Sequence, residues 1–156
     1  MNTTLLAFAI VVAVGCAFAL GWTLARRWRP ARRHLAMTSA GDPKQWPFSA
    51  AVEVGETMYL AGHLGVVPPG GGTPDPPEVE AEKVLQSMRD TLQRLGMGLD
   101  DLVFVQVFCP DVSHFGPFDQ AYRRAFGHPM PARAFIGSGP LLFGARFEVQ
   151  GIAVRR

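Results

Sequence analysis

The sequence predicts an α+β domain in which one sheet carries two helices on the same face. Two stretches predict the helices, because apolar residues recur at three- and four-residue steps over 78–95 and again over 113–126. Short apolar runs on both sides of these stretches, bounded by glycine, proline and aspartate, predict the strands. The expected order of elements is β-β-β-α-β-α-β-β, and the first strand has the weakest signal.

The strands before the first helix are short. Residues 34–38 are a candidate first strand. The apolar runs 50–54 and 57–63 flank the pair Gly55-Glu56, and two such runs joined by a two-residue link with glycine favour a β-hairpin. The stretch 65–77 is so rich in proline and glycine that we expect it to form a loop.

The first helix is the clearest element of the sequence. Glu78, Glu80 and Glu82 lie near its N-terminus, where the helix dipole favours negative charge. Gly96 suits the position just beyond a helix end. The apolar stripe that should face the sheet consists of Ala81, Val84, Leu85, Met88, Leu92 and Leu95.

The second half of the chain supplies the centre of the sheet. The run 102–109 is apolar almost throughout, which indicates a strand covered by helices on at least one face. Ser113 is the expected N-cap of the second helix. Because the far face of the last strand, 146–155, also carries apolar residues, we expect it to pack against another copy of the chain. Alternation places Phe147, Val149, Gly151 and Ala153 on one face of that strand and Glu148, Gln150, Ile152 and Val154 on the other.

The first residues predict a membrane anchor. Residues 3–24 contain no charged side chain and would extend about 33 Å as a helix, enough to cross a hydrocarbon core of about 30 Å. An arginine-rich linker, 25–33, follows at once. The positive-inside rule then places the soluble domain, 34–156, on the cytoplasmic side of an inner or plasma membrane. The alternative is a cleaved signal peptide with Ala17-Phe18-Ala19 as its cleavage site, but no basic segment precedes the apolar run.

Composition excludes several classes of function. The net charge of +2 is too small to predict nucleic acid as a partner. Cys16 and Cys109 have no cysteine or histidine at ligand spacing, so we expect neither a metal site nor a disulfide framework. Gly70-Gly71-Gly72 lacks the ending of a phosphate-binding loop, and no other motif indicates a cofactor.

One arginine lies in the apolar stretch 131–137. Arg133 falls within a predicted strand, where a guanidinium is costly to bury without a partner. Its planar fork suits a carboxylate. That carboxylate belongs either to the protein itself, with Glu148 as a candidate, or to a small ligand held in a cleft.

The ordered motifs of the soluble domain resemble those of the Rid/YjgF superfamily, whose best-known members are enamine/imine deaminases. The resemblance implies a chorismate-mutase-like fold, a homotrimer and ligand clefts between neighbouring subunits. The motifs that carry it are Tyr59-Leu60-Ala61-Gly62-His63, Leu99-Asp100-Asp101-Leu102-Val103, Val107-Phe108, Phe118-Asp119-Gln120-Ala121-Tyr122, Phe126, Pro131-Ala132-Arg133 and Gly151-Ile152-Ala153-Val154.

The resemblance also implies a site centred on Arg133, the arginine with which the family grips the substrate carboxylate. The glutamate that orients the hydrolytic water in the family corresponds here to Gln150. His63 stands where the family often has glutamine and is a candidate substitute proton carrier. The other implied substrate-binding positions are Phe48 in place of a tyrosine, Ala61 in place of a hydroxyl residue, Asp119 in place of an asparagine, and Gly62 and Phe135.

These replacements affect the chemistry that the resemblance implies. A base helps water add to the C=N carbon of an imine, and its loss typically costs about 10²- to 10⁴-fold in rate. Gln150 can position a water but cannot accept its proton. We therefore expect a protein that binds small carboxylate metabolites. Hydrolysis of 2-imino or 2-enamino acids is one interpretation, and a non-catalytic ligand-binding or scaffold trimer at the membrane is the alternative. RNA cleavage, proposed for some members of the family, is disfavoured by the small net charge.

Overall fold

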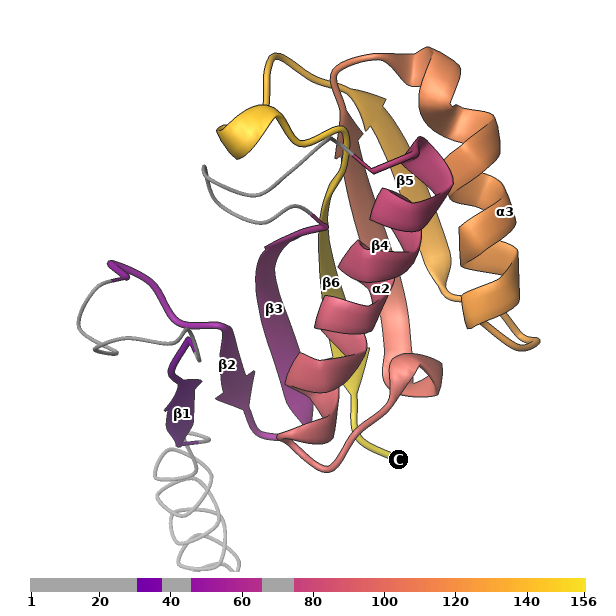
Figure 1. Ribbon diagram of the computed structural model, residues 1–156. Helices are drawn as coiled ribbons and strands as arrows, with labels where there is room; N and C mark the ends of the chain where they lie inside the picture. Colours follow the sequence, from indigo (N-terminus) through magenta and orange to yellow (C-terminus); the bar gives the residue numbers. More distant parts are fainter. Residues whose placement is uncertain (1–30, 38–45, 66–74) are drawn as a thin grey trace, which may run out of the picture. The chain divides into compact units, whose positions relative to one another are not determined.

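Residues 31–37, 46–65 and 75–156 are described by the computed structural model (Figure 1). The chain divides after Ala31, and the unit from Arg32 to Arg156 contains every helix and strand discussed below. The expected membrane segment, 3–24, lies outside the described residues. Within the described ranges, no helix has the length and apolar character needed to cross a bilayer.

A sheet of six strands, in the order β1-β2-β3-β6-β4-β5, forms the framework of the unit. The pair β4–β5 is parallel and every other pair is antiparallel. A parallel pair needs a long crossover, and α3 supplies it between β4 and β5. The strands are β1 (Arg32–Leu35), β2 (Ala51–Val54), β3 (Thr57–Leu64), β4 (Leu102–Cys109), β5 (Ala132–Gly137) and β6 (Glu148–Val154).

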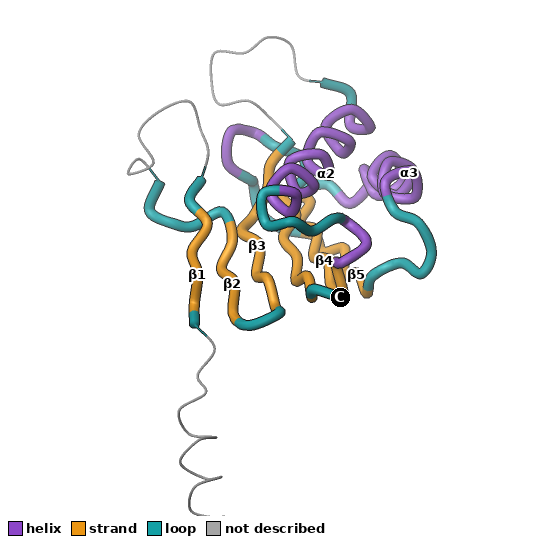
Figure 2. Tube along the Cα trace, turned by 90° about the horizontal axis from the view of Figure 1, so that it is seen from below, coloured by secondary structure: helices purple, strands orange, loops and turns teal. Residues whose placement is uncertain are grey.

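Two helices cover one face of this sheet, as Figure 2 shows. They are α2 (Pro77–Gln93) and α3 (Phe115–Ala125). The predicted element order and the α+β class with two helices on one face are therefore confirmed. Among the described residues, short 3₁₀ turns at Leu99–Asp101, Val112–His114 and Leu142–Gly144 connect the longer elements.

Several predicted boundaries differ from those observed. The first strand begins at Arg32 rather than at residue 34, because the arginine-rich segment already pairs with β2. Ser113 is not the cap of the second helix. Instead, the Asp111 carboxylate accepts a hydrogen bond of 2.9 Å from the Ser113 backbone N–H and caps a 3₁₀ turn that leads into α3. The last strand is shorter than 146–155, because Arg146 and Phe147 direct their backbone N–H groups to a helix side chain instead of a strand.

The core lies between the sheet and the two helices. The predicted alternation of β6 is confirmed, because Phe147, Val149 and Ala153 are fully buried while the other face of the strand is covered less. Gly55 has a positive φ in the predicted hairpin between β2 and β3, the conformation that such tight turns require. The side chains buried on both sides of the core include Met58, Val105, Val107, Val84, Met88, Leu92 and Phe118.

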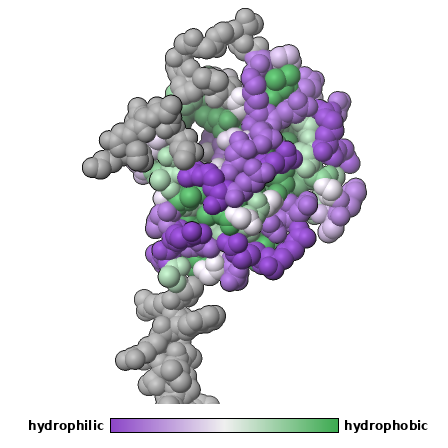
Figure 3. Space-filling model, turned by 60° about the horizontal axis from the view of Figure 1, so that its bottom comes forward, coloured by the Kyte–Doolittle hydropathy of each residue, from purple (hydrophilic) through white to green (hydrophobic). Residues whose placement is uncertain are grey.

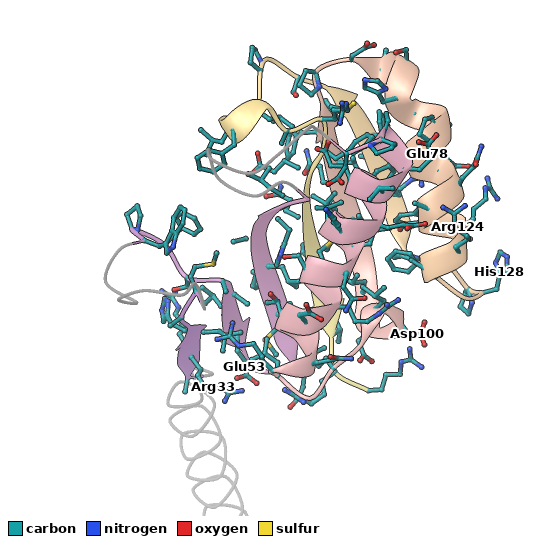
Figure 4. All side chains as sticks on the ribbon, viewed as in Figure 1. Arg33, Glu53, Glu78, Asp100, Arg124 and His128 are labelled. Atoms are coloured by element: carbon teal, nitrogen blue, oxygen red, sulfur yellow. The ribbon has the colours of Figure 1, made fainter. Side chains whose placement is uncertain are left out.

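The face of the sheet without helices leaves large apolar side chains exposed. Tyr59 is 50% exposed, Val103 48% and Ile136 38%. The expectation that a second copy of the chain packs on this face stays a prediction. Figure 3 shows another view of the surface, on which polar residues predominate and apolar residues form smaller patches between them. Among the surface ion pairs is Arg33–Glu53, which joins β1 to β2 (Figure 4).

A buried glutamate fixes the approach to β6. Glu80 of α2 is 1% exposed, and its Oε1 accepts hydrogen bonds from the backbone N–H groups of Arg146 at 2.6 Å and Phe147 at 3.3 Å. Its Oε2 pairs with Nη1 of Arg146 at 2.7 Å. The same Nη1 also donates to the carbonyl oxygen of Asp75. One carboxylate thus holds the start of β6 to the first turn of α2.

Replacing Glu80 should destabilise the fold more than replacing any exposed glutamate of α2. Glu80→Ala leaves the Arg146 guanidinium and two backbone N–H groups without their acceptor, so we expect a loss of about 3 kcal/mol in the free energy of unfolding. Urea denaturation of the full chain measures this loss. The matched control is Glu82→Ala, because Glu82 forms a half-exposed pair with Arg124 that should be worth at most about 1 kcal/mol. Equal losses in the two variants would contradict the role given to Glu80.

Candidate functional site

A β-bulge in β3 brings together three of the predicted site residues. Leu60 pairs with Gly151 and His63 with Val149, so Ala61 and Gly62 both lie opposite the single residue Gln150. A bulge of this kind places two residues of one strand against one of its partner and leaves the ladder locally open. Ala61, Gly62 and Gln150 therefore lie together on the face of the sheet without helices, which we call the open face.

The side chains of Gln106 and Glu148 also lie in this group, although the sequence motifs did not place them beside the other three residues. Gln106 lies opposite Gln150 in the register of β4 and β6, and Nε2 of Gln150 donates to Oε1 of Gln106 at 3.1 Å. Glu148 packs directly over Gly62. A Cβ at position 62 would overlap with Oε1 of Glu148 and lie 2.9 Å from its carboxyl carbon. A larger residue at position 62 would therefore require the Glu148 side chain to shift.

Arg133 lies on the other side of the sheet, in the edge strand β5. Its Nη2 donates to Oδ1 of Asp119 at 2.7 Å, and its guanidinium carbon lies 4.4 Å from the centre of the Tyr122 ring. The ring of Phe115 is 5.6 Å from the same carbon. The second nitrogen, Nη1, is buried and has no hydrogen-bond partner among the described residues. Among the described residues, only one of the two terminal nitrogens of the guanidinium therefore has a hydrogen-bond partner.

Asp119 is the intramolecular partner of Arg133, and this pair corrects one expectation. Glu148 is not that partner, because it lies on the opposite face of the sheet. The side chain of Asp119 is only 17% exposed. The hydrogen bond from Arg133 and a second one from Arg123 at 2.7 Å hold the pKa of Asp119 below its usual value.

Aromatic rings complete the environment of Arg133. Phe135 lies on the same face of β5 and makes edge contacts with Phe115 and Phe118, at ring-centre distances of 5.2 and 5.6 Å. The hydroxyl of Tyr122 is buried without a hydrogen-bond partner among the described residues, and burial raises the pKa of Tyr122 to about 12. The cation therefore lies over aromatic rings, whose faces attract a positive charge.

The remaining two predicted positions lie apart from both groups. His63 points toward α2, where its Nδ1 is 2.9 Å from the Ser87 hydroxyl, and it borders a pocket of about 190 Å³ beneath that helix. Phe48 precedes β2, is 48% exposed and meets Trp46 edge to face at 5.7 Å. The proposed catalytic role of His63 and the binding role of Phe48 stay predictions. Within the described parts of the chain, no cluster of three or more histidine, cysteine, aspartate or glutamate residues could hold a metal ion.

Burial of His63 should make the stability of the fold decrease at acidic pH. Desolvation lowers the pKa of His63 to about 4, so the imidazole is neutral near pH 7. In the unfolded chain it would take up a proton near pH 6.5, so stability should fall as the pH decreases from 6.5 to 4, by on the order of 3 kcal/mol. In His63→Gln, urea denaturation across this range should show a smaller slope of stability against pH. The control is His128→Gln, because His128 is exposed (Figure 4). An unchanged slope in His63→Gln would contradict this assignment.

Comparisons with known proteins agree with the motifs and the fold. A family model described as Endoribonuclease L-PSP matches residues 40–155. A 2-iminobutanoate/2-iminopropanoate deaminase of Mus musculus is 32% identical over 124 residues, which cover 79% of this chain and 92% of the relative.

Solved structures give the same result. RidA from the Antarctic bacterium Psychrobacter has a TM-score of 0.69 at 27% identity, covering 79% of this chain and 100% of that one. The YEO7 protein of yeast has a TM-score of 0.71 at 25% identity, covering 81% of this chain and 100% of that one. The chain therefore belongs to the Endoribonuclease L-PSP family, which is the Rid/YjgF superfamily that its motifs resemble.

Proposed function

We propose that this protein is an imine deaminase that hydrolyses small 2-imino or 2-enamino acids to 2-keto acids and ammonia. The observation that carries the proposal is the half-engaged guanidinium of Arg133, whose buried Nη1 needs an acceptor that no described residue supplies. A carboxylate is the acceptor that best suits an arginine. The named activity of the mouse relative supports the choice of reaction.

The arrangement of the two residue groups supports a site shared between copies of the chain. Arg133 faces the helices, whereas Ala61, Gly62 and Gln150 lie on the open face, so one small ligand cannot touch both groups within a single chain. Arg133 is in the edge strand β5, where a neighbouring copy can approach it. A homotrimer, with its clefts between subunits, would bring the open face of one copy to Arg133 of the next.

Removing the guanidinium should weaken recognition of the substrate carboxylate. We expect Arg133→Ala to lower kcat/KM for freshly generated 2-iminopropanoate by about 10- to 100-fold, since a hydrogen bond to a charged group is worth about 1.5–3 kcal/mol. Arg133→Lys should recover part of this loss, because lysine keeps the charge but not the planar fork. The assay follows ammonia release above the rate in buffer. Arg124→Ala is the control, because Arg124 is exposed and pairs with Glu82 of α2 (Figure 4). Unchanged kinetics in Arg133→Ala would contradict the proposed clamp.

The second candidate function is a non-catalytic trimer that binds small carboxylates. The amide at Gln150 favours it, because this position cannot take a proton from water. In that case the wild-type protein would release no ammonia above the buffer rate. A small carboxylate such as pyruvate would still raise its melting temperature, and Arg133→Ala would abolish the shift. The ammonia assay therefore separates the two functions.

We also propose that residues 3–24 anchor the protein in a membrane, with the domain on the cytoplasmic side. The uncharged span and the arginines that follow it support this topology. The full chain should stay in the membrane pellet during extraction with alkaline carbonate, whereas a chain lacking residues 1–31 should move to the supernatant. Release of the full chain by carbonate would contradict the anchor.

A further inference from the structure

A small polar pocket lies beneath the second half of α2, on the side of the sheet that carries the helices. Its volume is about 190 Å³. Pockets for drug-sized ligands measure about 300–1,000 Å³, so this one suits a molecule of only a few heavy atoms. The helix side of the pocket is lined by Ser87, Asp90, Thr91 and Arg94, and the sheet side includes His63.

The polar lining from α2 is a stripe on one face of the helix. Ser87, Asp90, Thr91 and Arg94 lie three or four residues from one another along this stripe, beside the apolar stripe of the core. Thr91 is only 7% exposed, and its hydroxyl has no hydrogen-bond partner among the described residues. Burying a hydroxyl without a partner is costly. The pocket therefore contains a polar group that the described chain leaves unpaired.

His63 and Ser87 add further uncharged polar groups to the floor of the pocket. The imidazole of His63 is 7% exposed and is neutral near pH 7. Its Nδ1 lies 2.9 Å from the Ser87 hydroxyl, and its Nε2 is buried without a partner in the described ranges. Two hydroxyls and an uncharged imidazole thus lie at the buried end of the pocket.

One negative and one positive side chain lie at the mouth of the pocket. Asp90 and Arg94 are both exposed and are separated by one helical turn. Oδ1 of Asp90 accepts a hydrogen bond of 2.6 Å from Gln86, whereas its Oδ2 has no partner among the described residues. Nη2 of Arg94 donates to the carbonyl oxygen of Ala36 at 2.7 Å. Its positive charge stays at the mouth whichever hydrogen bonds the guanidinium makes.

We propose that this pocket is a second ligand site, which binds a small zwitterionic α-amino acid. The ammonium group of the ligand pairs with Asp90, its carboxylate lies in the field of Arg94, and the hydroxyls of the pocket contact its polar groups. A ligand with a single charge meets one like charge at the mouth, whereas a zwitterion meets an opposite charge with each of its groups.

The pocket is separate from Arg133. His63 is in β3 and Arg133 in β5, and the strand order places these strands three spacings, or roughly 14 Å, apart. The inference therefore does not rest on the proposed function.

The first test measures binding of an amino acid to the full chain. In equilibrium dialysis with radiolabelled L-alanine, we expect one bound molecule per chain and a Kd of about 1 mM or below. Ethylamine and propanoate each keep one of the two charges, so they should compete at least about 10-fold more weakly than unlabelled L-alanine. No saturable binding up to about 10 mM L-alanine would overturn the inference. Equal competition by either single-charge compound would overturn the choice of a zwitterion.

The second test locates the bound amino acid. Asp90→Asn keeps the size of the side chain and removes its charge, so the Kd for L-alanine should rise at least about 10-fold. Glu82→Gln removes an exposed carboxylate of the same helix and should leave the Kd unchanged. Arg133→Ala should also bind L-alanine as the wild-type protein does.

The melting temperature of each variant verifies that it folds. An unchanged Kd in folded Asp90→Asn would overturn the inference. Loss of binding in folded Arg133→Ala would place the amino acid at the Arg133 site and would overturn the inference as well.

Discussion

The two-residue periodicity of a β-strand decides where each candidate residue of this protein can act. Neighbouring positions of a strand point to opposite faces. Arg133 in β5 and Gln150 in β6 therefore lie on opposite sides of the sheet, although only β4 separates their strands. The bulge in β3 is the local exception. It places Ala61 and Gly62 on the same face of the sheet, both opposite the single residue Gln150.

Arginine–carboxylate pairs serve two different purposes in this fold. Glu80 and Arg146 fix the start of β6, and every oxygen of the glutamate has a partner. The pair between Asp119 and Arg133 is incomplete, because one arginine nitrogen has no partner among the described residues. The degree to which each charge is paired thus distinguishes the structural ion pair from the arginine proposed to meet a ligand.

Local patterns predicted the fold well because they depend on neighbours in the chain. The stripe of α2, the hairpin at Gly55 and the two faces of β6 follow from periods of 3.6 and 2 residues. Contacts between distant residues were harder to predict. The bulge that turns His63 toward α2 depends on pairing with β6, and the choice of Asp119 over Glu148 as the partner of Arg133 depends on how α3 crosses β5. Asp119 lies far from Arg133 in the sequence, so the local pattern around either residue does not predict their contact.

The countercharge at Asp119 has a kinetic consequence for a ligand at Arg133. A carboxylate that reaches the free nitrogen joins a cation whose field is already partly cancelled, so its electrostatic attraction is weaker than at a bare guanidinium. Weaker attraction shortens the dwell time of a bound anion, since affinity differences reside mainly in the dissociation rate. If Arg133 binds a carboxylate as proposed, the Asp119 countercharge would favour rapid exchange of that ligand over its retention.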